Sequence, residues 1–247
     1  MFPKIIISSF SFPLYPICVA IGFLIGTIIL QKIFVKNGSS EKLAFYAMCF
    51  TEAGVIIGGK ILFWIINFYR LKKVYETFGL IGLFSKTGFV FYGGLFGGIL
   101  GIFVFSKFFK QSFIEILTFV ISITPLIHAF GRFGCLCAGC CYGTPYSGLF
   151  SVYLRGENRF PVQALEATLN IFLFVVLQIL LAKNKKSVIP IYFFSYGLIR
   201  FFCEQFRDDV KRGFIGCLSV SSWISLFIII AGIVTFIIIL NNKKGKK

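Results

Sequence analysis

The chain has 247 residues, of which 57% are hydrophobic and only 14% are charged, and its formal net charge is +16. A soluble domain carries about 25% charged residues, so this composition excludes an ordinary soluble fold and makes the bilayer the solvent for most of the chain. The lysines lie between apolar segments, which favours lipid headgroups and membrane topology over nucleic acid as the reason for the positive charge.

Seven apolar runs of transmembrane length follow one another along the chain. Each is predicted to be a helix, because the bilayer offers no partner for free backbone polar groups. We therefore expect an all-α integral membrane protein of about seven transmembrane helices, built as a single polytopic domain over residues 1–247. The predicted spans are about Tyr15–Val35, Leu43–Tyr69, Gly88–Phe105, Phe113–Phe130, Val162–Ala182, Val188–Phe206 and Gly213–Leu240.

The connections alternate between short lysine-rich links and longer segments. With an odd number of spans, the lysine-rich links and the basic tail fall on one face, which the positive-inside rule makes cytoplasmic. The N-terminus is then expected outside and the C-terminus in the cytoplasm. The outer loops, which are long enough to build a site, are about 70–87, 131–161 and 207–212.

The stretch from His128 to Gly143 contains an arginine and four glycines where the fourth span reaches the outer interface. An arginine at such a depth is costly unless it is paired or binds an anion. The planar guanidinium of Arg132, beside backbone that glycine leaves accessible, suits a phosphate group. The alternative is an arginine that only extends to the interface to reach water. His128, the only histidine, is a candidate base or a cap of the span.

A second polar group lies in the sixth span. Tyr196, Arg200 and Glu204 follow at intervals of four, which places them on one helix face, and Arg207 comes three residues after Glu204. An arginine and a glutamate within a span indicate a functional site. The alternative is a structural ion pair that joins two helices.

Four cysteines, Cys135, Cys137, Cys140 and Cys141, fall within seven residues. Soft ligands of this kind bind zinc or iron–sulfur clusters, but the spacing C-x-C-x2-C-C lacks paired C-x-x-C units, and the side chains of two adjacent cysteines are expected to point apart. A disulfide, a reactive thiol pair and simple packing in the apolar interior remain as alternatives. We expect no metal ion at this site.

The third span begins with four glycines next to Tyr92. Small residues at this spacing favour close packing of helices, and Tyr92 beside them is a candidate for facing a cavity. In the second span, Glu52 and Lys60 among further glycines indicate a polar interior face.

Together these segments resemble the prolipoprotein diacylglyceryl transferase family. The resemblance covers most of the chain and depends on the order of the motifs, since no single motif is specific. The motifs are Tyr15 at the first span, Gly-Gly-Lys ending at Lys60, Tyr-Gly-Gly from Tyr92, Gly-Arg-Phe-Gly around Arg132, the run from Arg159 to Glu166, and Tyr196, Arg200, Glu204 and Arg207.

The resemblance implies transfer of the diacylglyceryl group of phosphatidylglycerol to the lipobox cysteine thiol of prolipoproteins, in the bacterial cytoplasmic (inner) membrane. It implies phosphatidylglycerol, prolipoprotein signal peptides and membrane lipids as partners, without nucleic acid and without a cofactor. The residues implied to be catalytic are Tyr92, Arg132, Tyr196, Arg200 and Glu204. The residues implied to bind substrate are Arg132, Gly143, Tyr15, Cys135, Cys140 and Arg207.

Four positions depart from the family's pattern. Many members have His where this chain has Tyr92, Asn where it has Cys135, Glu where it has Cys140 and Gln where it has Ser222. The alternative function is therefore that of a divergent member without transfer activity, which acts as a thiol-redox, metal-binding or lipid-binding membrane protein.

Overall fold

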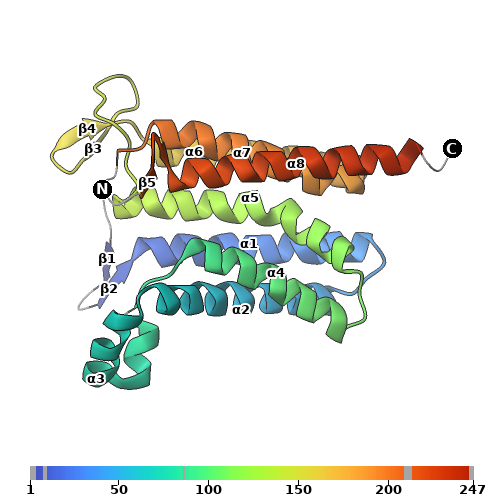
Figure 1. Ribbon diagram of the computed structural model, residues 1–247, viewed down its shortest axis with the longest axis horizontal. Coiled ribbons are helices and arrows are strands. Elements are labelled where there is room, and N and C mark those ends of the chain that lie inside the picture. Colours follow the sequence, from blue (N-terminus) through green and yellow to red (C-terminus); the bar gives the residue numbers. More distant parts are fainter. Residues whose placement is uncertain (1–3, 8–9, 86, 209–212, 245–247) are drawn as a thin grey trace. The chain divides into compact units, whose positions relative to one another are not determined.

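The computed structural model describes residues 4–7, 10–85, 87–208 and 213–244, which are mostly helical (Figure 1). The helices are α1 (Leu14–Lys36), α2 (Glu41–Ile66), α3 (Phe68–Ser85), α4 (Phe91–Phe108), α5 (Phe113–Ala138), α6 (Val162–Lys183), α7 (Val188–Gln205) and α8 (Val220–Lys244). The short strands β1 (Lys4–Ile7), β2 (Phe10–Pro13), β3 (Val152–Leu154), β4 (Glu157–Arg159), β5 (Phe214–Ile215) and β6 (Leu218–Ser219) pair in sequence as three antiparallel hairpins.

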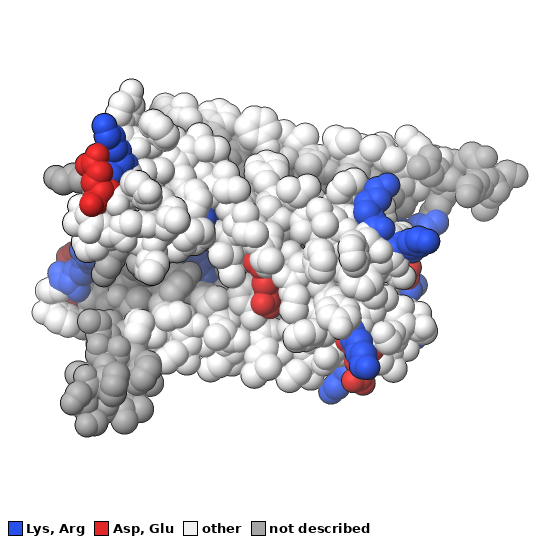
Figure 2. All heavy atoms as spheres, turned by 90° about the horizontal axis from the view of Figure 1, so that it is seen from below, with Lys and Arg blue, Asp and Glu red and all other residues white. Residues whose placement is uncertain are grey.

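Six helices in the described part of the chain are long and apolar enough to cross a membrane, namely α1, α2, α4, α5, α6 and α8. This confirms the prediction of an all-α integral membrane protein. On the face that Figure 2 shows, most charged side chains lie in separate groups, and the surface between these groups is uncharged except for one acidic side chain. The remaining predicted span is the helix α7, whose hydropathy is lowered by Arg200 and Glu204. Seven crossings with the N-terminus outside stay a prediction.

The predicted outer loop at 70–87 is largely helical, because it coincides with α3. This helix is interrupted at Gly79, whose φ of +62° lies in the left-handed region that glycine adopts without strain. Its charged residues made the segment too polar to be predicted as a span. They do not oppose helix formation, because Lys, Arg and Glu are good helix formers.

The fourth predicted span ended at Phe130, whereas α5 continues to Ala138. Arg132 and the first two clustered cysteines are therefore helical residues and not part of a loop. Gly131 and Gly134 lie inside the helix and do not end it. The helix ends after Ala138, because Gly139, with a φ of +67°, forms the left-handed turn that commonly closes an α-helix.

The last predicted span also begins later than expected. Residues 214–215 and 218–219 form the hairpin β5–β6, and α8 starts at Val220. Of the predicted outer loop at 207–212, residues 209–212 lie outside the described residues.

The chain divides into two compact units. Unit 1 comprises Met1–Ile29 and Ile121–Lys247, and unit 2 comprises Leu30–Val120. The helices α1 and α5 each contribute residues to both units. The expectation of a single domain stays a prediction.

In unit 2, α2 and α4 pack against each other through their backbones. A side chain on Gly54 would collide with the carbonyl oxygen of Gly97, and one on Gly58 would collide with that of Gly93. The four-residue spacing of these glycines places them on one face of each helix. The expectation that the glycines of this region serve helix packing is confirmed, since small residues allow backbones to approach closely in lipid.

In unit 1, α5, α6, α7 and α8 run alongside one another. Figure 1 shows the C-terminal ends of α5 and α7 and the N-terminal ends of α6 and α8 at the same end of this unit, beside the hairpin β3–β4. Polar side chains also join the helices, since Gln178 donates from Nε2 to the carbonyl of Ser122 at 2.9 Å. The buried charged side chains of unit 1 lie toward this end.

Candidate active site

The carboxylate of Glu166, in the second turn of α6, lies at the centre of a buried charged group. Its Oε1 is 2.9 Å from Nη2 of Arg132, and its Oε2 is 3.1 Å from Nη1 of Arg200. Nε2 of His128 is 3.5 Å from the same Oε1. Only 1% of the Glu166 side chain is exposed, so a single carboxylate joins α5, α6 and α7 out of contact with bulk water.

A second buried carboxylate, Glu204 on α7, extends this group. Its Oε2 accepts from Nη2 of Arg200 at 2.8 Å and from Nη1 of Arg207 at 3.3 Å. Arg200 also donates to Oγ of Ser221 at 3.2 Å. We call Arg132, Arg200, Arg207, Glu166 and Glu204 the charged network. It contains three guanidinium groups and two carboxylates.

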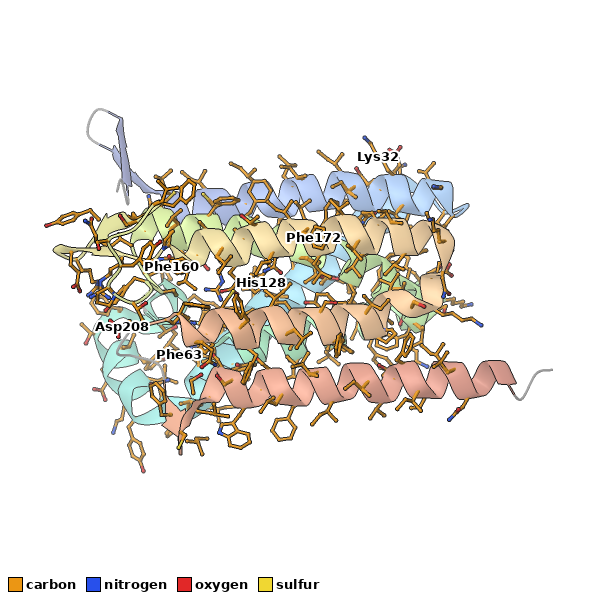
Figure 3. All side chains as sticks on the ribbon, turned by 90° about the horizontal axis from the view of Figure 1, so that it is seen from above. Lys32, Phe63, His128, Phe160, Phe172 and Asp208 are labelled. Carbon is orange, nitrogen blue, oxygen red and sulfur yellow. The ribbon has the colours of Figure 1, made fainter. Side chains whose placement is uncertain are left out.

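The network follows from helical periodicity. His128 and Arg132 are one turn apart on α5, and Nε of Arg132 lies 3.3 Å from Nε2 of His128. Tyr196 and Arg200 are one turn apart on α7, and the ring of Tyr196 packs 5.3 Å from that of His128. Figure 3 shows His128 well inside the bundle, whereas Asp208 lies near its end.

Arg159 holds the loop after α5 beside this network through hydrogen bonds and a ring contact. Its Nη1 donates to the carbonyl of Gly143 at 3.0 Å and to Oδ2 of Asp208 at 2.9 Å, and its guanidinium lies 4.4 Å from the ring centre of Tyr142. Gly143 forms a backbone bridge with Arg207. A side chain on Gly143 would collide with the carbonyl oxygens of two neighbouring segments, so glycine is required there for close backbone approach.

The three cysteines Cys135, Cys140 and Cys141 converge at the end of α5, with their sulfur atoms all within 4.8 Å of one another. The thiols of Cys135 and Cys140, which hydrogen-bond to its sulfur, hold the pKa of Cys141 below the usual thiol value. The guanidinium groups of Arg132 and Arg207 act in the same direction. All eight cysteines of the chain are described, and none forms a disulfide.

A small hollow of about 70 Å³ borders Glu204 on the side of the β5–β6 hairpin. Ser219 and Ser222 contribute hydroxyl groups to its lining, and Cys217 lies at its edge. The two serine hydroxyl groups are 3.1 Å apart. The second carboxylate of the network is thus bordered by a polar recess, although that recess holds only a few water-sized groups.

The structure brings together most of the residues that the sequence singled out. Arg132, Arg200, Glu204 and Arg207 share ion pairs, Tyr196 reaches them through His128, and Cys135 and Cys140 lie in the thiol cluster. Gly143 adjoins Arg207, and Tyr15 packs against the backbone of Gly134. Tyr92 belongs to unit 2, where its ring packs against that of Phe91.

Glu166 was not among the predicted site residues, although it proves to be the centre of the network. The sequence did carry a signal for it, because a carboxylate within an apolar span is costly and therefore marks a function. His128 was not among the predicted site residues either, although it lies in direct contact with the network.

Fold and site together define a multi-span membrane protein with a buried arginine–glutamate network at the ends of its helices. The sequence profile described as prolipoprotein diacylglyceryl transferase matches residues 4–238. The chain therefore belongs to the prolipoprotein diacylglyceryl transferase family, which confirms the resemblance seen in its motifs. With its apolar helices, this makes it a multi-pass protein of the bacterial cytoplasmic membrane.

Individual relatives agree with this assignment. The chain is 33% identical over 242 residues to phosphatidylglycerol–prolipoprotein diacylglyceryl transferase 2 of Clostridium perfringens (strain 13 / Type A), which covers 94% of this chain and 92% of the relative. It is 32% identical over 231 residues to the enzyme of Clostridium tetani (strain Massachusetts / E88), covering 90% and 91%. It is 29% identical over 236 residues to that of Clostridioides difficile (strain 630), covering 94% and 92%.

Proposed function

We propose that this protein transfers the diacylglyceryl group of phosphatidylglycerol to the lipobox cysteine thiol of prolipoprotein signal peptides. The names of its relatives specify both substrates. The observation that carries the proposal in this chain is the convergence of Arg132 and Arg200 on the single buried carboxylate of Glu166. Buried guanidinium groups that share one counter-ion are costly unless they serve a function, and they keep further N–H donors for a bound anion.

The phosphate of phosphatidylglycerol supplies that anion. Arg132 and Arg200 bind its oxygens in this proposal, because a guanidinium offers a planar set of donors that matches a phosphate. Both side chains are mostly buried, with 13% and 12% exposed, and both are already fixed by Glu166. Glu166 is thus a positioning residue, which holds the two phosphate-binding groups before the lipid arrives.

The reaction exchanges one bond for another at the glycerol C3 carbon. The cysteine sulfur forms the C–S bond, the C–O bond to the phosphate breaks, and glycerol phosphate leaves with the electron pair of that bond. Negative charge develops on the leaving phosphate, where arginine side chains are most effective. The remaining thiol proton must leave the sulfur before or during the attack.

The charged network also favours a thiolate. Arg132 and Arg207 contribute to the lowered pKa of Cys141, and they would act in the same way on an incoming cysteine placed beside them. His128, in contact with Arg132, is the residue we assign to accept the proton, since a ring nitrogen of a neutral imidazole can act as a general base. Glu204 acts instead as a counter-ion, because two guanidinium groups already occupy its Oε2.

The other residues keep the roles that the family resemblance implies. Tyr92 and Tyr196 are proposed to be catalytic, and Tyr15, Gly143, Cys135, Cys140 and Arg207 to contact the substrates. The N-terminus is proposed to face outward, which places the charged end of unit 1 on the side where prolipoproteins emerge.

The test is a transfer assay with purified protein, phosphatidylglycerol and a lipobox peptide with one cysteine, followed by mass spectrometry. The expected product carries diacylglyceryl on that thiol and is reduced by about 10²–10³-fold in Arg132→Ala and Arg200→Ala. Arg155→Ala is the matched control, since this exposed arginine lies outside the network. Unchanged transfer in both network variants would contradict the proposal, as would lipid binding without any modified peptide.

A further inference from the structure

The end of α5 folds Cys140 back over Cys135. The N–H of Cys140 donates to the carbonyl of Cys135 at 3.2 Å, and the N–H of Gly139 donates to that of Leu136 at 3.2 Å. With the left-handed φ of Gly139, this is a Schellman cap, in which the side chains of the two outer residues come into contact. Such contacts are usually apolar, whereas here they join two thiols.

Cys141 brings a third sulfur to the same place. Its φ of +56° is left-handed, a conformation that costs a non-glycine residue roughly 1–2 kcal/mol. An observed backbone outlier of this kind is grounds for inferring a function. The sequence predicts that adjacent Cys140 and Cys141 point apart, and the left-handed turn instead directs both sulfurs towards Cys135.

We propose that Cys135, Cys140 and Cys141 form a binding site for a thiophilic divalent metal ion of the zinc type. Zinc–sulfur bonds of about 2.3 Å place the sulfurs of a tetrahedral site roughly 3.8 Å apart. The three sulfurs lie within 4.8 Å of one another, so shifts of about 1 Å or less complete the coordination. Three protein ligands leave the fourth position to solvent, which reaches the half-buried Cys140 and Cys141.

The loop that carries two of the ligands is held from both sides. Gln163 donates from Nε2 to the carbonyl of Cys140 at 2.7 Å, and the N–H of Asp208 donates to the carbonyl of Tyr142 at 3.1 Å. These contacts fix the backbone of Cys140 and Cys141 before an ion binds, as the surroundings of metal ligands do. The ion replaces the thiol protons, which leave to solvent, and no oxidant is needed.

Cys137 provides the matched control. It lies two residues after Cys135 on the same helix, so it faces another side of α5 and does not join the cluster. A site made of three specific thiols should therefore tolerate the loss of Cys137. Nonspecific binding of metal ions to a cysteine-rich protein should instead be weakened equally by the loss of any of the four cysteines.

The experiment is a Cd²⁺ titration of the full-length, reduced protein in detergent without oxygen. It is followed by thiolate-to-metal absorption in the near ultraviolet and by elemental analysis of bound cadmium. One Cd²⁺ per chain is expected, with affinity reduced by roughly tenfold or more in Cys135→Ser, Cys140→Ser and Cys141→Ser. Cys137→Ser should bind like the unaltered protein, and Mg²⁺ should produce no absorption. Absence of binding, or equal effects of all four substitutions, would overturn the proposal.

A second measurement needs no substitution and so does not depend on the folding of variants. Membranes that contain the unaltered protein are treated with a maleimide with and without Cd²⁺, and labelled peptides are quantified by mass spectrometry. Cd²⁺ should reduce labelling of Cys135, Cys140 and Cys141 and leave that of Cys137 unchanged. Equal labelling of the three cysteines in both samples would also reject the site.

Discussion

The two compact units hold their helices together by different means. In unit 2, α2 and α4 meet through glycines, and the contact is between backbones. In unit 1, α5, α6 and α7 are joined by the charged network around Glu166. Glycine packing needs no charge and suits a scaffold in lipid, whereas buried charge is costly and is retained where it binds or reacts. The comparison places the charged network in unit 1, whereas Tyr92, also proposed to be catalytic, lies in unit 2.

The largest effect is expected from Glu166→Gln. Removal of this carboxylate leaves Arg132 and Arg200 without their shared counter-ion, which should cost about 3–5 kcal/mol of stability. Transfer should fall by about 10²–10³-fold. Both are measurable by thermal unfolding in detergent and by the transfer assay. Glu157→Gln is the control, because that carboxylate is 44% exposed and should contribute about 1 kcal/mol or less.

Two further results would show whether Glu166 positions the two arginines for catalysis or only stabilises the fold. Glu166→Asp keeps the charge, so it should restore part of the transfer rate that Glu166→Gln loses. The lipid KM should rise in Glu166→Gln, because the phosphate-binding arginines are no longer held in place. A variant that unfolds earlier but transfers at the normal rate would mean that the network is only structural.

The next effect tests the packing of unit 2. Gly54→Ala should destabilise the protein by about 1–3 kcal/mol, because the new methyl group meets the backbone of Gly97, which cannot turn away. Thermal unfolding in detergent measures the loss. Gly131→Ala is the matched control on α5, since a Cβ there meets nothing within 4 Å. An equal unfolding temperature for the two variants would show that the α2–α4 contact is not tight.

A smaller effect is expected from Lys60→Met, which removes hydrogen bonds between α2 and the end of α3 within unit 2. Nζ of Lys60 donates to the carbonyls of Phe84 and Thr87 at 2.7 and 2.9 Å, at the end of α3. Its loss should cost about 1–2 kcal/mol and raise amide hydrogen exchange in α3. Exposed Lys42→Met is the control, and unchanged exchange would show that α3 is held by other contacts.

The smallest expected effect concerns the reactivity of the Cys141 thiol and not the stability of the protein. Because its pKa is lowered, the thiolate should persist as the pH falls below the usual thiol range. Its rate of alkylation should then change little between pH 8 and about pH 6, whereas that of an ordinary thiol falls about tenfold per pH unit. Peptide mass spectrometry after brief iodoacetamide treatment measures this, with N-acetylcysteine as reference. If the alkylation rate of Cys141 decreased in parallel with that of N-acetylcysteine, its pKa would not be lowered.

The sequence by itself determined the membrane class, the positions of the helices and most of the polar groups in the site. Composition and uninterrupted apolar runs suffice for the first two, because the bilayer permits few alternatives to a helix. The four-residue spacing of Tyr196, Arg200 and Glu204 placed these side chains on one face, because helical periodicity is local. The order of the motifs was enough to indicate the family.

Only the tertiary structure decided which of those groups meet. Glu166 became the centre of the network because α5, α6 and α7 converge on it, and no local pattern specifies that convergence. The cysteines form one cluster because Gly139 and Cys141 adopt left-handed backbone angles. Spacing alone predicts different directions for the side chains of adjacent residues. Contacts between distant segments depend on packing and on rare backbone conformations, which the sequence records only indirectly.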